Sequence, residues 1–384
     1  MSQSLAIALP LYPLTREHAD RFGLEHLRQV LPPSCTHLVC RVPEADDVTR
    51  WRPHRIGGQS YQVAQPITFT PYAAAQPCSA RCLFCSENLR VRGGYTPAAL
   101  QRPGAEYFEE LRLALRELEG LPLSYSLSGL ELTDDVGFMG ALLDVLTEHA
   151  VRSPVEQRVL YSNGAGFAGE HRAGLIARLR AFDLSWLELS RHHFDAVRNQ
   201  NIMRFRDGQA HRDASVFDAL LAELCQAFGV KLVCIAQRDG VDSVAELRRY
   251  WDWAAERGVK NVILREFSKL DASYLRNGTA RYIDGARVDV EALLVEASQR
   301  LGPELQLHTV TAGYYFWNVV GSYHGMEVTF EVADYALMHA QHGSSRIFKL
   351  VHHANGALCA GWDPDQHLLF DARSARSRSL RDGS

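Results

Sequence analysis

The chain has 384 residues, of which 46% are hydrophobic and 22% charged, and its formal net charge is −4 at pH 7. These values are typical of a globular protein with one large domain and a smaller one. The basic residues form no stripe, which argues against a sequence-independent nucleic-acid surface. No apolar run is long enough to predict a membrane span.

The start of the chain and its cysteines indicate the compartment. Residues 1–5 carry no basic group ahead of the first apolar stretch, so a secretory signal is not expected. The chain has eight cysteines, three clustered and five scattered, which is not the pattern of a small disulfide-linked secreted domain. We therefore expect a protein of the reducing cytoplasm.

Taken in chain order, residues 1–65 are an N-terminal extension with a helix predicted near 15–30 and a strand near 37–41. From 66 to 270, short β-branched runs alternate with helical patterns. The runs predict strands at 67–71, 125–130, 158–162, 186–190, 231–236 and 261–266. The patterns between them predict helices near 104–118, 136–149, 169–181, 214–228 and 243–257. This alternation predicts a parallel sheet with right-handed crossovers.

The last of these helices has clear boundary signals. Ser243 and Glu246 have the spacing of a capping box, and Gly258 follows as a stop. After 270 the pattern changes. Residues 327–332 alternate polar and apolar, and runs at 346–353 and 357–362 flank an Asn-Gly turn at 355–356. We expect 271–370 to be an α+β region whose small antiparallel sheet covers the open side of the barrel, and 371–384 to be a disordered tail.

The most informative motif follows the first strand of the 66–270 segment. Cys78, Cys82 and Cys85 form a C-x₃-C-x₂-C run, with Phe84 just before the last cysteine. Three thiolates on one loop hold three irons of a [4Fe–4S] cluster, and no fourth cysteine follows nearby to close the fourth iron. The alternative is a structural zinc site, but such sites usually combine two separated ligand pairs, and no second pair follows.

This motif resembles the signature of radical S-adenosylmethionine (SAM) enzymes. The resemblance implies a partial (β/α)₆ barrel of the TIM type, which agrees with the independent strand count. The barrel looks like that of the branch with the molybdenum-cofactor cyclase and the peptide-modifying maturases. Those proteins usually carry a second cysteine cluster after the barrel, whereas here only Cys359 lies beyond Cys234. No auxiliary cluster is therefore expected.

The resemblance also assigns SAM contacts. Phe84 would pack beside the cluster and the adenine, or serve only as a core aromatic. Gly129, Leu130 and Glu131 stand where the family has Gly-Gly-Glu, whose carboxylate binds the methionine amino group. Leu130 replaces the second glycine, which puts the backbone approach in doubt; the alternative for Glu131 is a solvated surface position. Further expected contacts at strand ends are Ser162, Asn163 and Ser190, and either Arg198 or Arg204 could pair with the SAM carboxylate.

Further candidates are weaker. Cys234 and Cys359 could give a thiol hydrogen to a product radical, although free cysteines more often simply pack. His192 and His193 could be ligands, acid–base groups or only polar residues at a strand end. Arg265 and Glu266 close an apolar strand, where a charged residue is usually functional or paired, and we expect one of them to face the site.

These observations predict a radical SAM enzyme that cleaves SAM reductively at a [4Fe–4S] cluster to a 5′-deoxyadenosyl radical. The radical would abstract hydrogen from a small-molecule or natural-product substrate, and a flavodoxin- or ferredoxin-type protein would supply the electron. Two alternatives stay open. One is a radical SAM enzyme that modifies a ribosomal peptide docked on a sheet edge. The other is a non-catalytic, metal-stabilised binding module.

Overall fold

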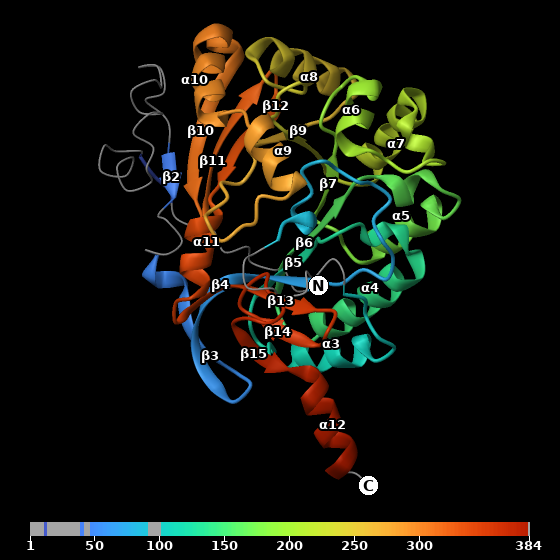
Figure 1. Ribbon diagram of the computed structural model, residues 1–384, viewed down its shortest axis with the longest axis vertical. Helices are drawn as coiled ribbons and strands as arrows, with labels where there is room; N and C mark the ends of the chain where they lie inside the picture. The colour runs from blue at the N-terminus through green and yellow to red at the C-terminus, as the bar shows by residue number, and fades with distance from the viewer. Residues whose placement is uncertain (1–10, 14–38, 42–46, 91–100, 383–384) are drawn as a thin grey trace.

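The computed structural model describes residues 11–13, 39–41, 47–90 and 101–382 (Figure 1). These residues form a mixed α/β protein around one 15-stranded sheet. The strands follow the order β1-β2-β10-β11-β12-β9-β8-β7-β6-β5-β4-β13-β14-β15, and β3 pairs with β4 off this path. The middle of this order is parallel and both ends contain antiparallel pairs, so the predicted fold class is confirmed.

The central strands form the predicted parallel core. They are β4 (Gln59–Tyr72), β5 (Leu123–Leu127), β6 (Val155–Ser162), β7 (Trp186–Ser190), β8 (Val230–Ile235) and β9 (Asn261–Arg265). The helices that follow them are α3 (Tyr107–Arg116), α4 (Val136–Ala150), α5 (Arg172–Ala181), α6 (Ala196–Met203), α7 (Ala214–Ala227) and α8 (Val244–Glu256). Figure 1 shows these helices along the outer side of the curved sheet. Because the six strands run parallel, their carboxyl ends all lie along the same side of the sheet, its carboxyl edge.

Local chemistry accounts for these elements. In β7, Leu187 and Leu189 are fully buried against the helix layer, as expected for a strand covered by helices. At the start of α8, the backbone N–H of Glu246 donates to the Ser243 hydroxyl at 3.3 Å. Gly258 follows the helix with a φ of 77°, where glycine has no steric cost. The predicted helix boundaries therefore hold.

The C-terminal strands extend the sheet at both edges. β12 (Met326–Ala333) pairs in parallel with β9, and β13 (Arg346–His353) pairs in parallel with β4. The helix α11 (Tyr335–His342) connects them. We expected the strands after residue 300 to form a separate antiparallel region. The alternating pattern of β12 suits either orientation, and the β12-α11-β13 crossover makes these two strands parallel.

Antiparallel pairs complete the C-terminal part. β10 (Leu305–Ala312) and β11 (Phe316–Tyr323) pair beside β12, and α9 (Gly278–Ala286) and α10 (Val290–Leu301) precede them. The predicted hairpin after β13 is present: β14 (Ala357–Cys359) pairs with β13, Gly356 has a φ of 83°, and β15 (Leu368–Asp371) follows. These strands lie at opposite edges of the sheet.

The N-terminal part is described in short pieces. β1 (Leu11–Pro13) pairs with β2 (Val39–Arg41), and β2 pairs in parallel with β10. β3 (Trp51–Ile56) forms an antiparallel pair with β4. The strand expected near 37–41 is therefore present over residues 39–41, whereas the helix expected near 15–30 lies outside the described residues.

The tail differs from the expected disorder. The helix α12 (Ala372–Asp382) projects from the body of the molecule in Figure 1. At its start the backbone N–H of Ser374 donates to the Asp371 carboxylate at 2.9 Å. Arg376 lies 3.1 Å from the Glu106 carboxylate just before α3. The Ser/Arg composition predicted a solvated tail, but a local cap and an acidic partner distant in sequence order this segment.

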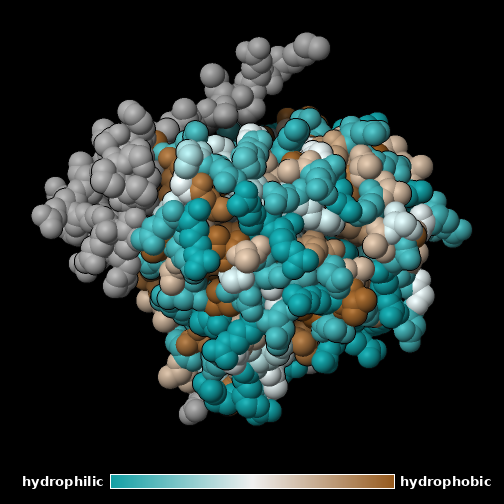
Figure 2. Space-filling view, turned by 90° about the horizontal axis from the view of Figure 1, so that it is seen from above, coloured by the Kyte–Doolittle hydropathy of each residue, from teal (hydrophilic) through white to brown (hydrophobic). Residues whose placement is uncertain are grey.

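Figure 2 shows a mainly hydrophilic face with apolar residues in small scattered groups. Among the described helices, none is long and apolar enough to cross a membrane.

Candidate functional site

The cysteine loop lies between β4 and α3, at the carboxyl edge of the parallel strands. Cys78, Cys82 and Cys85 are all half-buried in it. The backbone N–H of Arg81 donates to the carbonyl of Met203 at 3.0 Å, which ties the loop to the end of α6. The three thiols are therefore held on a short segment that is hydrogen-bonded to the end of α6.

The thiols are poor sites for isolated negative charge. Burial raises the pKa of Cys78 to about 12 and that of Cys85 to about 11. The pKa of Cys82 is raised as well, first by burial and then by the charges of Cys85 and Cys78. Thiolates in such surroundings are stabilised when a metal cation binds them. The donor set of three neighbouring thiols therefore fits iron–sulfur ligation.

The arrangement differs from a site for one ion. In the described ranges, no three His, Cys, Asp or Glu side chains meet at a point that could hold a single metal ion. A zinc ion needs its ligands about 2.3 Å from one centre. A cube instead presents a separate iron to each thiolate, and its ligands stand further apart.

Glu131 is the centre of a buried hydrogen-bond cluster behind the cysteine loop. Its side chain is only 2% exposed. One carboxylate oxygen accepts from the hydroxyls of Thr133 and Ser162 at 2.6 and 2.8 Å, and the other accepts from the backbone N–H of Asn163 at 2.5 Å. The carboxylate thus joins the loops after β5 and β6. Burial and the charge of Asp134 raise its pKa to about 7, against the lowering effect of these hydrogen bonds.

The same cluster reaches the first cysteine. The side-chain amide of Asn163 donates to Sγ of Cys78 at 3.5 Å and to the Ser79 hydroxyl at 3.0 Å. The Asp134 carboxylate accepts from the backbone N–H of Ser79 at 2.7 Å. We call Glu131, Asp134 and Asn163 the loop brace, because they connect two strand-end loops to the segment that carries Cys78. Sequence reasoning named Glu131 and Asn163 for another role and did not name Asp134.

The turn at Gly129 shapes the neighbouring surface. Gly129 has a φ of 94° and Leu130 a φ of 56°, so β5 ends at Leu127 and not at 130 as the sequence predicted. A Cβ on Gly129 would lie 2.1 Å from the ring of Tyr72. The strand prediction failed here because the β-like run continues into a turn that only glycine accommodates beside an aromatic ring.

The other expected SAM contacts are spread around this edge. Phe84 packs edge-on against His192 at 4.9 Å between ring centroids and beside Phe267 at 5.5 Å. Ser190 is half-buried at the end of β7, and Arg204 is exposed after α6 in the left-handed region, with a φ of 51°. Their contact with SAM remains a prediction.

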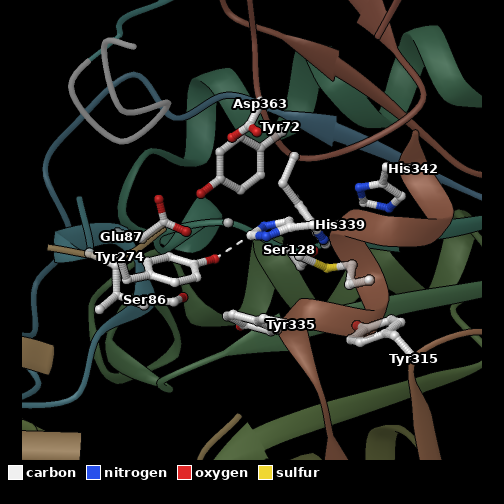
Figure 3. Close-up of a pocket in the computed structure, with 14 residues that line it drawn as sticks. Tyr72, Ser86, Glu87, Ser128, Tyr274, Tyr315, Tyr335, His339, His342 and Asp363 are labelled. Atoms are coloured by element: carbon white, nitrogen blue, oxygen red, sulfur yellow. Dashed lines mark hydrogen bonds between the residues drawn. The ribbon is translucent and has the colours of Figure 1, made fainter. Parts of the chain in front are cut away.

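A cavity of about 270 Å³ opens beside the cysteine loop (Figure 3). One wall comes from the parallel strands and the cysteine loop, and the other from α11 and the C-terminal loops. Its lining residues are Tyr72, Ser86, Glu87, Leu89, Ser128, Gly129, Tyr274, Tyr315, Tyr335, Met338, His339, His342, Trp362 and Asp363. Of the residues expected to bind SAM, only Gly129 is in this lining. The sequence analysis did not identify the other lining residues, because the second wall is formed by segments that follow the barrel.

Two polar groupings mark the cavity wall. Burial raises the pKa of Tyr72, and the charge of the neighbouring Glu87 raises it further; burial also raises the pKa of Glu87. The Tyr274 hydroxyl lies 3.3 Å from Nε2 of His339 (Figure 3), and the other ring nitrogen, Nδ1, lies 3.1 Å from the Asp271 carboxylate. The carboxylate orients the imidazole so that Nε2 faces the phenol. This arrangement can pass a proton between the cavity and His339.

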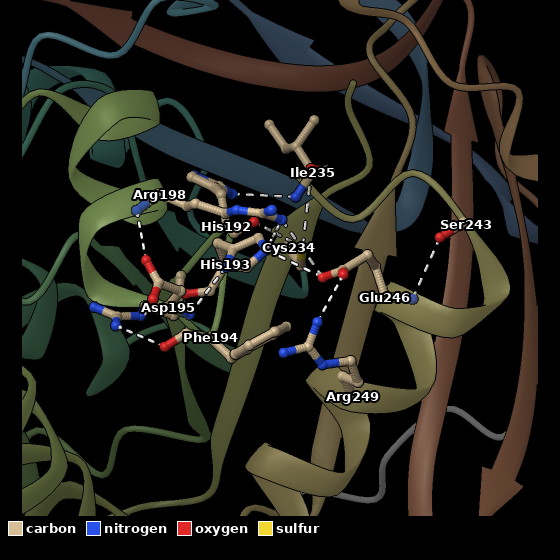
Figure 4. A network of polar contacts seen from close by, with 11 residues as sticks. His192, His193, Phe194, Asp195, Arg198, Cys234, Ile235, Ser243, Glu246 and Arg249 are labelled. Carbon is tan, nitrogen blue, oxygen red and sulfur yellow. Dashed lines mark hydrogen bonds and ion pairs between the residues drawn. The ribbon is translucent and has the colours of Figure 1, made fainter. Parts of the chain in front are cut away.

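The two cysteines expected to donate hydrogen do not reach the cavity. Cys234 is fully buried in β8, with its thiol 3.5 Å from the carbonyl of His192 (Figure 4). Cys359 is fully buried in β14, with its thiol 3.9 Å from the carbonyl of Pro364. Neither lines the cavity. Their burial agrees with the packing role that the sequence also allowed, and their role as hydrogen donors stays a prediction.

The histidine pair is structural. The backbone N–H of Ile235 donates to Nδ1 of His192 at 3.1 Å, and burial lowers the pKa of His192 to about 3. Nε2 of His193 lies 3.3 Å from the Glu246 carboxylate at the start of α8 (Figure 4). These contacts join the ends of β7 and β8 to α8. They fit the interpretation of the two histidines as polar residues at a strand end.

Arg265 is also paired. Its guanidinium lies 3.0 Å from Glu188 of β7 and 2.6 Å from Glu331 of β12. Because β12 and β9 are neighbours, this ion pair connects the C-terminal extension to the central strands. Arg265 therefore has its charge compensated within the protein.

No family model matches the sequence, and no curated protein matches it. Solved structures do. SuiB from Streptococcus suis bound to S-adenosylmethionine is 12% identical with a TM-score of 0.45, covering 91% of this chain and 66% of that one. The enzyme anSMEcpe with bound AdoMet and Cp18Cys peptide is 16% identical with a TM-score of 0.39, covering 52% and 50%. Coproporphyrinogen III oxidase from Escherichia coli, a radical SAM enzyme, is 12% identical with a TM-score of 0.37, covering 67% and 66%.

This chain thus spans about half to two thirds of the length of these three proteins. The structures that it resembles are radical SAM enzymes, at low sequence identity.

Proposed function

We propose that this protein is a radical SAM enzyme that cleaves SAM reductively and acts on a small molecule held in the cavity beside the cysteine loop. The observation that carries this proposal is the position of the C-x₃-C-x₂-C motif. Its three thiols lie at the carboxyl edge of six parallel strands, next to a cavity whose wall includes Ser86 and Glu87 directly after Cys85. Active sites of parallel α/β proteins collect at this edge.

The cysteines would hold three irons of a [4Fe–4S] cluster, with the fourth iron open to SAM. When bound, the cluster and SAM supply a one-electron cleavage chemistry that the protein side chains cannot perform. A flavodoxin- or ferredoxin-type protein would provide the electron. The amide of Asn163 donates to Sγ of Cys78 and so favours the more negative, reduced state of the cluster.

Glu131 acts as a positioning residue in this proposal. Its carboxylate accepts bonds from Thr133, Ser162 and Asn163, which fixes the two strand-end loops next to the cysteines. The side chain is 2% exposed, and these three hydrogen-bond partners are all groups of the protein itself. The backbone turn at Gly129, which does line the cavity, is the part of this motif that a bound cofactor would touch.

The cavity supports a substrate of limited size. At about 270 Å³ it lies just below the usual range of small-molecule pockets. Aromatic rings line it from both walls, among them Tyr72, Tyr335 and Trp362. They would exclude water from a reactive intermediate. His339 and Tyr274 would exchange a proton with the substrate, with Asp271 holding the imidazole in place.

Anaerobic reconstitution tests this proposal. We expect a brown protein with about four irons per chain that forms 5′-deoxyadenosine from SAM and dithionite. Cys82→Ala should abolish 5′-deoxyadenosine formation, whereas Cys225→Ala, in the unrelated helix α7, should not. A colourless protein loaded with zinc, or full cleavage by the Cys82 variant, would refute the proposal. The first result would instead support a non-catalytic, metal-stabilised module.

A further inference from the structure

Lys349 is a buried lysine for which the described residues provide no carboxylate partner. It lies in β13, opposite Thr68 of β4, and is 8% exposed. Its Nζ lies 4.2 Å from the centre of the Trp362 ring. Within the described part of the chain, this ring face is the contact of the ammonium, and no carboxylate lies within ion-pair distance of it. Burial alone lowers the pKa of Lys349, to about 7.

Other buried cations of this protein are compensated. Arg265 lies against two carboxylates, and Arg287 lies 2.8 Å from the Glu266 carboxylate. A buried charge without such a partner is expensive, and proteins rarely retain one unless something else supplies the opposite charge. Lys349 differs from these arginines because no carboxylate of the described residues lies beside it.

The ammonium lies next to the cavity wall. Trp362, on whose face it sits, lines the cavity, as does His342. Burial, and to a smaller extent neighbouring positive charge that includes Lys349, lowers the pKa of His342 to about 3. The imidazole is neutral, and neither of its protonation states supplies the negative charge that would balance the lysine. Lys349 itself is not among the residues that line the cavity, but the Trp362 ring that its ammonium contacts is, so the ammonium is one side chain away from the cavity.

We propose that Lys349 binds a carboxylate of the substrate, so that the substrate is a compact carboxylic acid with an apolar body packed among the cavity's aromatic rings. This inference rests on the proposed function, because it assigns a substrate class to the same cavity. The bound carboxylate is the counter-ion that the protein omits, and Trp362 holds the ammonium in place by cation–π attraction. A neutral isostere of the acid would leave the ammonium unpaired.

The test measures binding, not turnover, on anaerobically purified, cluster-loaded protein. Calorimetry compares 3-phenylpropanoate with its neutral amide, 3-phenylpropanamide. Wild type should bind the carboxylate at least about tenfold more tightly, and Lys349→Met should remove this preference. Lys231→Met is the matched control, since that ammonium lies 4.3 Å from the Trp186 ring in β7 and should not affect the preference.

Several results would overturn the inference. One is that wild type binds both probes equally or binds neither, and another is that Lys349→Met keeps the preference. A third such result is that Lys349→Met loses affinity for SAM while it keeps the probe preference, because the anion would then be the cofactor's carboxylate. Iron content and 5′-deoxyadenosine formation are measured on the same preparations. Their failure refutes the proposed function but leaves the carboxylate preference as a separate result.

Discussion

Replacing Lys349 by methionine should stabilise the protein, because it removes a buried charge while keeping an unbranched side chain of similar length. The pKa of Lys349 falls from 10.5 to about 7 in the folded state. Each unit of this difference corresponds to about 1.4 kcal/mol, so the charged form costs up to about 5 kcal/mol of folding free energy. That is a large share of the stability of a typical domain.

The sign of the pH dependence follows from the direction of the shift. The unfolded chain binds the lysine proton more tightly than the folded protein, so the free energy of unfolding rises as pH increases from 7 towards 10.5. The cost is present in full below pH 7 and disappears above 10.5. The advantage of Lys349→Met should therefore be about 5 kcal/mol at pH 6.5 and about 3 kcal/mol at pH 8.5. Burial also lowers the pKa of His342 to about 3 and that of His353 to about 4, so both rings are neutral in the folded protein; their titration near pH 6.5 in the unfolded chain is common to both variants and cancels in the difference.

Equilibrium urea unfolding of both proteins at the two pH values provides the measurement. Lys349→Arg is the control, because a guanidinium stays charged throughout this range and its deficit against the methionine variant should not shrink as pH rises. The reasoning fails if Lys349→Met is less stable than wild type at pH 6.5. It also fails if the advantage of the methionine variant is the same at both pH values.

Three further predictions concern the loops around the cysteines. Asn163→Ala removes the amide that donates to Sγ of Cys78; we expect the cluster potential to fall by about 40 mV in an EPR-monitored titration, and an unchanged potential would contradict this role. Glu131→Ala leaves several buried donors without an acceptor; it should lower the free energy of unfolding by about 3 kcal/mol and reduce iron retention. Gly129→Ala forces a Cβ into the Tyr72 ring at a φ of 94°; we expect a loss of about 2 kcal/mol in urea unfolding and weaker SAM binding by calorimetry.

Matched control variants exist for the last two changes. Glu170 has a side chain that is 87% exposed, so Glu170→Ala should alter neither stability nor iron retention. Gly169 has open space around its Cβ position and no positive φ, so Gly169→Ala should be tolerated. If Glu170→Ala behaved like Glu131→Ala, the role assigned to the loop brace would be refuted. If Gly169→Ala behaved like Gly129→Ala, the role assigned to the Gly129 turn would be refuted.

Local patterns were sufficient for the central strands and helices. β7 has the predicted bounds of residues 186–190, and α8 begins after Ser243 as the capping residue indicated. These elements are encoded by a short-range period and by caps a few residues away, which a single sequence displays. The cysteine spacing is equally local, so the candidate iron–sulfur loop was also visible at this level.

Features that depend on contacts between distant segments could not be predicted from local patterns. Cys234 alternates with its neighbours along β8, but only the placement of α8 shows that its thiol faces the core and not the cavity. The tail was expected to be disordered, and its helix depends on a contact between Arg376 and Glu106. The SAM contact of Glu131 stays a prediction, but the bonds that its carboxylate accepts from Asn163 and Ser162 join the loops after β5 and β6, which no local pattern shows.

The order of secondary-structure elements and the three-thiol loop came from the sequence by itself, because both depend on residues close together in the chain. The parallel placement of β12 and β13, the cavity wall that α11 contributes, and the isolation of Lys349 were decided only by tertiary structure. Each of these features depends on contacts between segments that are distant in the chain. The residue pattern within one segment does not show which other segment it will contact. A lysine in an apolar run looks alike whether or not a carboxylate lies across from it.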